Sequence, residues 1–219
     1  MRLFLVFLLG FCMNATAVSP KRYLALGDSY TIGESVPEAG RFPVQLVAAL
    51  QEQGLAFAAP ELIARTGWTT AELQAAIDLA KPKPPYDLVT LLIGVNNQYR
   101  GGDLRRYRSE FTKLLLHAIA LAGRDKQQVL VISIPDWGVT PFARKDKRGG
   151  KRIGKQIDAF NAEALDVCNK NGVRFINITA VSRDRGGDAA MLTADELHPS
   201  AAMYARWVEV IVRDGFSPR

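Results

Sequence analysis

The sequence predicts an α/β protein with a flavodoxin-like architecture, a three-layer α/β/α sandwich around a five-stranded parallel sheet. Short apolar runs alternate along the chain with longer segments whose apolar residues recur at helical spacing. The short runs are continuously apolar, which is typical of parallel strands that are buried on both faces. For a doubly wound sheet of this size we expect the strand order 2-1-3-4-5, with right-handed crossovers.

The strands are predicted from apolar runs that stop at glycine, proline, asparagine or a polar loop. In chain order, the expected strands are residues 22–26, 61–64, 88–93, 129–134 and 173–178. The run at 88–93 is the most strand-like, because only Thr90 interrupts its apolar character.

The helices are predicted from single apolar stripes and from their capping signals. Thr69 and Glu72 fit a capping box, and Gly54 and Gly172 stand where helix C-caps are expected. The proline-rich residues 81–85 stop one helix abruptly. The expected helices are residues 41–53, 69–80, 103–122, 153–171 and 200–213. Residues 139–152 and the polar stretch after residue 178 are expected to be loops.

The first residues have the pattern of a secretory signal peptide. Arg2 precedes a short apolar run at residues 3–11, and Ala15 and Ala17 give a small-x-small cleavage pattern. We therefore expect residues 1–17 to be removed and residues 18–219 to form a single domain that is exported to a periplasm or out of the cell. A membrane anchor is excluded by length, and a lipoprotein reading of Cys12 is disfavoured by the bulky residue before it.

The composition is that of an ordinary globular domain with a mild positive charge. The 219 residues are 48% apolar and carry a formal net charge of +6. A mild positive excess does not by itself imply nucleic-acid binding, which needs a clustered basic face, and none is expected. The basic run at 144–152 either attracts an anionic glycan or phospholipid headgroup or, as we expect, is a solvated loop. Cys168 alone remains after cleavage, so no internal disulfide is expected, and its pattern is that of a small core residue.

A serine stands immediately after the end of the first predicted strand. That strand stops at Gly27, and Asp28 and Ser29 follow at once. Ligands of open α/β sheets bind beyond the carboxyl ends of the strands. At the start of a helical turn a backbone N–H is unpaired and is free to stabilise a negative oxygen. Ser29 is therefore the candidate nucleophile.

The chain has two histidines, and they differ in context. His117 lies inside a predicted helix at the edge of its apolar stripe, which favours a structural or surface role. His198 follows the last predicted strand, with Asp195 three residues before it, and a carboxylate so placed can fix the imidazole tautomer. Residues 193–196 also match a capping box, so a helix start is the alternative, although it gives no reason for the histidine.

Two further strand ends supply candidate hydrogen-bond donors. Gly67 follows the second strand and offers a bare backbone N–H, and Asn96 follows the third and offers a side-chain amide. With the N–H of Ser29 they would form a three-donor oxyanion hole. Taken singly, each is better explained as a turn residue.

Together these blocks resemble those of the SGNH (GDSL-type) hydrolases. The matching residues, in order, are Gly27-Asp28-Ser29, Gly67, Gly94-Val95-Asn96-Asn97 and Asp195-Glu196-Leu197-His198-Pro199. The resemblance implies that Ser29 is the nucleophile, His198 the base and Asp195 its orienter. It implies Ser29, Gly67 and Asn96 as the oxyanion donors of an esterase that needs neither metal nor cofactor. The absence of a Gly-x-Ser-x-Gly elbow argues against a standard α/β-hydrolase.

The chain departs from the family pattern at two positions. Tyr30 stands where a leucine usually follows the serine, and Asn97 stands where an aspartate commonly follows the oxyanion asparagine. The second departure puts in doubt the hydrogen bonds that hold that loop, more than the chemistry itself.

The substrate is only weakly encoded. Trp68, Trp137 and Phe142 follow strand ends and are expected at the rim of the site, where they either contact a sugar ring or acyl chain or pack within loops. No long apolar lid segment is evident, so we expect short acyl groups such as acetyl on a carbohydrate or small-molecule ester. The alternatives are a lysophospholipase or thioesterase that takes longer chains, and a secreted binding protein without activity. No stable membrane anchor is expected.

Overall fold

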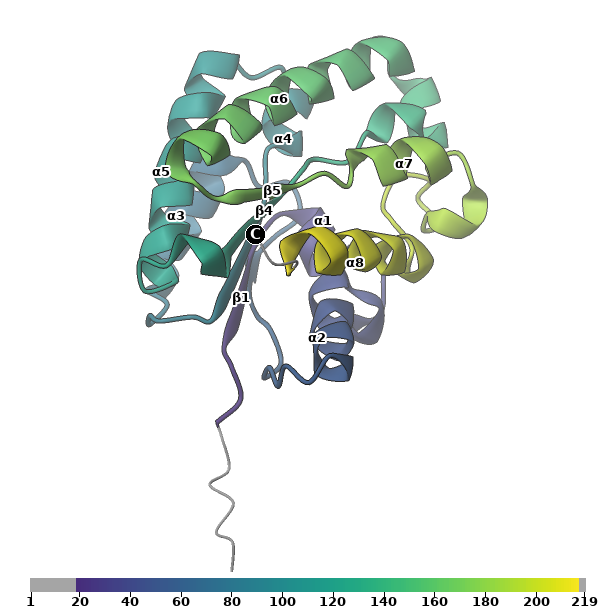
Figure 1. The fold of residues 1–219 in the computed structure, drawn as a ribbon. Helices are drawn as coiled ribbons and strands as arrows, with labels where there is room; N and C mark the ends of the chain where they lie inside the picture. Colours follow the sequence, from purple (N-terminus) through teal and green to yellow (C-terminus); the bar gives the residue numbers. More distant parts are fainter. Residues whose placement is uncertain (1–18, 217–219) are drawn as a thin grey trace, which may run out of the picture.

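The computed structural model describes residues 19–216 and contains one five-stranded parallel sheet between two helical layers (Figure 1). Neighbouring strands are parallel, and their order is β2-β1-β3-β4-β5. The predicted fold class and strand order are thus confirmed. The expected signal peptide lies outside the described residues. The strands are β1 Tyr23–Gly27, β2 Glu61–Ala64, β3 Leu88–Leu92, β4 Val129–Ile132 and β5 Arg174–Ile176.

Two helices pack together on one face of the sheet and three on the other. Helices α2 and α8 contact each other, whereas α5 contacts both α3 and α6 (Figure 1). Three short helices, α1, α4 and α7, follow strand ends. The bounds are α1 Ser29–Ile32, α2 Phe42–Glu52, α3 Thr70–Ala80, α4 Val95–Tyr99, α5 Leu104–Leu121, α6 Gly150–Asn171, α7 Thr179–Arg185 and α8 Ala201–Gly215.

The core forms where the helix stripes meet the sheet. Every residue of β1, β3 and β4 is buried, as continuous apolar runs predict. The predicted capping box of α3 is present, because the backbone N–H of Thr69 donates to Glu72 Oε2 at 2.8 Å and the Thr69 side chain accepts in return. Fully burying one leucine or phenylalanine side chain is worth about 1.5–3 kcal/mol, so this core supplies most of the favourable free energy.

The stretch after residue 178, which the sequence predicts to be a loop, contains helix α7. Its buried residues are Thr179 and Ser182, so it has no apolar stripe to reveal it. Polar contacts hold it instead. The Thr179 N–H donates to Ser133 Oγ at 3.1 Å, and the Ser182 hydroxyl accepts from the backbone N–H of Asp136 at 2.8 Å. The loop prediction for 139–152 is also wrong in part, because a 3₁₀ turn covers Pro141–Lys145 and α6 begins at Gly150.

The carboxyl ends of β1, β2 and β3 meet at one edge of the sheet, and the segments that follow them carry the candidate site. Helix α1 begins one residue after β1, and α4 begins shortly after β3. Within residues 19–216, no helix is both long enough and apolar enough to cross a membrane.

Candidate active site

Ser29 is the first residue of α1, and its position is fixed by its two predecessors. Asp28 caps the helix, because its Oδ1 accepts from the backbone N–H of Tyr30 at 3.0 Å. Gly27 has no room for a side chain: an added Cβ would lie 2.1 Å from Thr31 Oγ1 and 2.4 Å from the carbonyl oxygen of Leu92. The tight passage from strand to helix therefore requires glycine, and it places Ser29 on the wall of a cavity.

Asp28 is fully buried, and only one of its two carboxylate oxygens accepts a hydrogen bond from a described residue. Its Oδ2 has no hydrogen-bond partner among the described residues. Burial raises the pKa of this carboxyl to about 7, against the lowering effect of the Tyr30 N–H. An ionised carboxylate in this position is costly, because water cannot reach the second oxygen.

His198 and Asp195 form the pair that the sequence predicts. His198 Nδ1 lies 2.6 Å from Asp195 Oδ2, and Asp195 Oδ1 accepts from the backbone N–H groups of Leu197 and His198, both at 2.9 Å. Burial raises the pKa of Asp195, but its hydrogen bonds from His198, Thr193 and Leu197 outweigh this and hold the pKa far below its ordinary value. An ionised Asp195 requires the proton on Nδ1, which leaves Nε2 free as the base.

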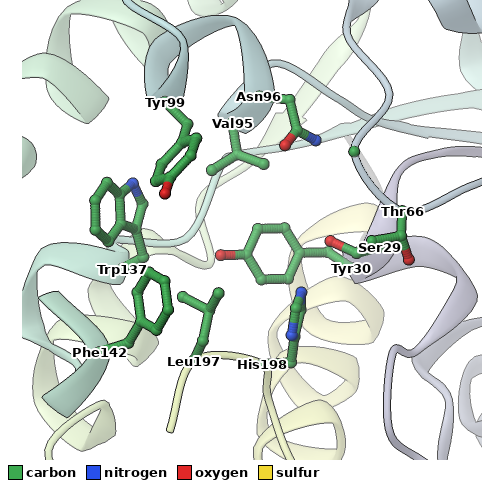
Figure 2. A pocket seen from close by; sticks show the side chains of 11 residues that line it. Ser29, Tyr30, Thr66, Val95, Asn96, Tyr99, Trp137, Phe142, Leu197 and His198 are labelled. Carbon is green, nitrogen blue, oxygen red and sulfur yellow. The ribbon is translucent and has the colours of Figure 1, made fainter. Parts of the chain in front are cut away.

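The turn that carries this pair is not a helix start. Helix α8 begins at Ala201, and Ser200 is its N-cap. Residues 193–198 instead close a turn in which the Thr193 N–H donates to the carbonyl oxygen of His198 at 2.8 Å, with Glu196 at φ +62°. Because Asp195 receives both backbone N–H groups of the turn, its side chain orients the ring and shapes the loop that holds it. Figure 2 shows His198 and Ser29 at the same end of the cavity.

Of the two expected oxyanion donors, Gly67 lies in the loop after β2 and Asn96 lies in helix α4, and hydrogen bonds tie the two segments to each other. Gly67 has φ +85°, a conformation that favours glycine, and its carbonyl accepts from Arg100 Nη2 at 2.6 Å. Asn96 donates one amide N–H to the carbonyl oxygen of Trp68 at 3.0 Å. Gly67 and Asn96 line the same cavity as Ser29. The structure thus brings together five of the residues predicted for the site: Ser29, Gly67, Asn96, Asp195 and His198.

Asn97 ties helix α4, which also carries Asn96, to Thr70 of α3 through two hydrogen bonds. Its Oδ1 accepts from the backbone N–H of Thr70 at 3.0 Å, and its Nδ2 donates to Thr70 Oγ1 at 2.7 Å. The Thr70 hydroxyl donates onward to Glu110 at 2.5 Å. An aspartate could accept at this position but could not donate the second bond. Having asparagine instead of aspartate at position 97 therefore keeps helix α4 firmly connected to α3.

The cavity has a volume of about 230 Å³. It runs from Ser29 to three aromatic side chains, Tyr99, Trp137 and Phe142, which we call the aromatic wall (Figure 2). Trp137 and Phe142 line it as predicted, whereas Trp68 does not and offers only its carbonyl to Asn96. The sequence prediction missed several lining residues. Val95 and Tyr99 stand four residues apart on α4, a helical spacing that would have revealed them, and Leu197 directly precedes His198. The missed lining residues are Tyr30, Thr66, Val95, Tyr99 and Leu197.

The aromatic wall is held from behind by polar groups. Trp137 donates its indole N–H to Gln98 Oε1 at 2.9 Å, and Gln98 donates to Gln156 of α6 at 2.8 Å. The Arg148 guanidinium lies 5.4 Å from the ring centre of Tyr99 and 5.2 Å from that of Trp137. Thus one member of the basic run, Arg148, is packed against the wall.

The other histidine and the cysteine lie outside the site. His117 Nδ1 contacts Gln74 Nε2 at 2.9 Å between α5 and α3, as its surface pattern suggests. Cys168 is buried in α6, and burial raises the pKa of its thiol to about 12, which leaves it unreactive. Within residues 19–216, no group of three or more His, Cys, Asp or Glu side chains is placed to hold a metal ion.

Comparisons with known proteins identify the family of the chain. The model of the GDSL-like lipase/acylhydrolase family matches residues 25–206. No curated protein sequence is significantly similar to the chain.

Solved structures of similar fold include a lipase from a goat rumen metagenome. It is 19% identical, with a TM-score of 0.71 over 90% of this chain and 98% of its own. An acetyl-xylooligosaccharide esterase from Geobacillus is also 19% identical, with a TM-score of 0.68 over 90% of this chain and 95% of its own. TesA is 21% identical, with a TM-score of 0.68 over 89% of this chain and 97% of its own.

Proposed function

We propose that this chain, a member of the GDSL-like lipase/acylhydrolase family and thus an ester hydrolase, cleaves short acyl esters of carbohydrates or small molecules with Ser29 as nucleophile. The observation that carries the proposal is the His198–Asp195 pair, with its 2.6 Å contact, at the Ser29 end of the cavity. The expected leader at residues 1–17 belongs to the same proposal, with residues 18–219 as an exported catalytic domain.

The proposed reaction has two steps. His198 Nε2 takes the proton of the Ser29 hydroxyl as Ser29 Oγ attacks the acyl carbon. The backbone N–H groups of Ser29 and Gly67 and the second amide proton of Asn96 hold the resulting oxyanion. The alcohol leaves with the proton from His198, and an acyl-enzyme remains. A water molecule, deprotonated by His198, attacks this ester, and the acid leaves while Ser29 recovers its proton.

The preference for short acyl groups is supported by the size and lining of the cavity. The cavity has a volume of about 230 Å³, and Tyr99, Trp137 and Phe142 line it on the side away from Ser29 (Figure 2). This leaves little room for a long chain in addition to the group that carries the ester. That one neighbour of similar fold is an acetyl-xylooligosaccharide esterase agrees with an acetylated carbohydrate, although at 19% identity the likeness concerns the fold. A lysophospholipase or thioesterase is the rival activity.

The deciding experiment is hydrolysis of an ester series from acetyl to long acyl by the wild type and by Ser29→Ala. Removal of the nucleophile should lower kcat by about 10⁶-fold and leave thermal unfolding unchanged. Ser109→Ala, an exposed serine of α5, is the matched control and should keep full activity. A folded Ser29→Ala protein with wild-type turnover would refute Ser29 as nucleophile. Faster turnover of long chains than of acetyl would favour the rival activity.

A further inference from the structure

Tyr30 places an unpartnered hydroxyl inside the cavity. Only 3% of the residue is exposed, yet the side chain has no hydrogen-bond partner among the described residues. Its ring is held by edge contacts to His198 and Trp207, with ring centres 5.8 Å and 6.0 Å apart. Burial raises the pKa of the phenol well above its ordinary value, so the hydroxyl keeps its proton. Tyr30 is therefore a fixed hydrogen-bond donor without an acceptor.

The direction of this donor is set by the backbone. The Tyr30 N–H is bound to Asp28 Oδ1, and its carbonyl accepts from the Tyr204 hydroxyl of α8 at 3.0 Å. Figure 2 shows the ring lying across the middle of the cavity, with its hydroxyl directed away from Ser29 and toward the aromatic wall. A substrate group that extends from the ester into the cavity must pass this hydroxyl.

We infer that Tyr30 determines specificity by donating a hydrogen bond to an oxygen of a sugar ring that carries the ester and lodges between Ser29 and the aromatic wall. This inference rests on the proposed function and names the substrate class, an O-acylated pyranoside. Two features of the cavity select it. Aromatic side chains, Tyr99 and Trp137, line the cavity and can contact the C–H groups of a pyranose, and the Tyr30 hydroxyl needs an acceptor that ring and hydroxyl oxygens supply.

An alkyl chain fits the same space less well. A buried hydroxyl that loses water without gaining a partner costs about 1–3 kcal/mol, so an aliphatic group next to Tyr30 would be disfavoured. A leucine at this position, as is usual in the family pattern, would carry no such penalty. The Tyr30 hydroxyl thus makes the cavity bind an oxygen-bearing ring in preference to a hydrocarbon group of equal size.

The test compares two acetate esters of six-membered rings, a mono-O-acetyl methyl pyranoside, whose ring and substituents carry oxygens, and cyclohexyl acetate, whose ring carries no oxygen besides that of the ester. We expect the wild type to have the higher kcat/KM for the sugar ester. Tyr30→Phe should reduce the ratio of the two values about tenfold, partly by gaining activity on cyclohexyl acetate. Tyr86→Phe removes a hydroxyl at the opposite end of the sheet and should leave the ratio unchanged. An unchanged ratio in Tyr30→Phe, or a wild type that prefers cyclohexyl acetate, would overturn the inference.

A binding measurement separates this inference from the proposed function. Methyl pyranoside without an ester is titrated into the Ser29→Ala protein, with binding followed by isothermal titration calorimetry, and again into the Ser29→Ala/Tyr30→Phe double variant. Weaker binding in the double variant supports the inference even if no ester is turned over. Equal binding overturns it even if the esterase is active. Absence of serine-dependent turnover on both esters would count against the proposed function alone.

Discussion

At the amino end of the sheet Tyr86 has a partner for its hydroxyl, whereas at the carboxyl end Tyr30 has none. The Tyr86 hydroxyl donates to Glu61 Oε2 at 2.6 Å, and Arg22 donates to Glu61 Oε1 at 2.9 Å while its guanidinium lies 4.1 Å from the Tyr86 ring centre. The backbone N–H of Arg22 donates to Asp87 Oδ2 at 2.7 Å. These groups use their hydrogen-bonding capacity to join the starts of β1, β2 and β3.

At the carboxyl end of the sheet, some polar groups make no hydrogen bond to another described residue. Within the described residues, the Tyr30 hydroxyl and Asp28 Oδ2 lack hydrogen-bond partners. A buried polar atom without a partner, such as Asp28 Oδ2, costs about 1–3 kcal/mol of stability. The contrast indicates that the amino end serves the fold, and that the carboxyl end carries costs that the fold alone does not require.

Among the variants that contrast the two ends of the sheet, the largest effect is expected from replacing Asp195, the residue that orients His198 at the carboxyl end. Asp195→Asn should lower kcat by about 10³–10⁴-fold, because an amide N–H facing His198 Nδ1 imposes the wrong tautomer. The free energy of unfolding at neutral pH should change by much less than the activation free energy that corresponds to this loss of kcat. Glu196→Gln is the control, because the carboxylate of Glu196, next to Asp195 in the chain, is exposed. Among the described residues it pairs only with Lys145, at 3.3 Å. Equal activity of the two variants would contradict the assigned role of Asp195.

A second prediction contrasts the pH dependence of two carboxylates. Burial raises the pKa of Asp28 to about 7, so from about pH 4 to 7 the native state binds a proton that the unfolded chain has released. Asp28 therefore makes stability fall as pH rises through this window, by at most about 1.4 kcal/mol per pH unit.

The two carboxylates should give slopes of opposite sign. Although burial raises the pKa of Glu61, the hydrogen bonds from Tyr86 and Arg22 lower it below its ordinary value. Its contribution is present above the unfolded pKa and is lost as pH falls through the folded pKa. Urea unfolding of the wild type, Asp28→Asn and Glu61→Gln from pH 3 to 8 would reveal both slopes in the difference curves. A flat difference for Asp28→Asn would show that its pKa is not raised.

The smallest effect is expected from deleting single hydroxyls. Tyr86→Phe should destabilise the protein by about 1 kcal/mol, because Glu61 loses a hydrogen bond. Tyr30→Phe should leave stability unchanged or raise it slightly, since its hydroxyl has no partner to lose. Thermal unfolding of both variants measures the difference. A Tyr30→Phe protein that is the less stable of the two would mean that its hydroxyl has a structural partner in solution.

The sequence predicts the strands and the candidate residues of this edge because each follows a local pattern. Apolar runs mark β1 and β3, and the residues just beyond them must share one edge of a parallel sheet. The prediction fails where contacts are distant. Helix α7 is held by Ser133 rather than by an apolar stripe, and nothing local indicates that bond.

The cavity lining shows the same limit. Trp68 and Trp137 both follow strand ends, yet only Trp137 lines the cavity. The indole of Trp137 is held in position by a hydrogen bond to Gln98, which is 39 residues away along the chain, and Gln98 is held by a hydrogen bond to Gln156. No pattern within one segment can predict a chain of hydrogen bonds between distant residues.

The hydrogen bonds between the loop after β2 and helix α4 have a consequence for how the enzyme binds its substrate. Arg100, at the end of α4, donates to the Gly67 carbonyl, and Asn96 of α4 donates to the Trp68 carbonyl. In the proposed mechanism the donors therefore stand in place before the ester arrives, and little reorganisation energy is spent when the charge develops. A site built in this way works by lock and key, and its turnover should not wait for a loop to close.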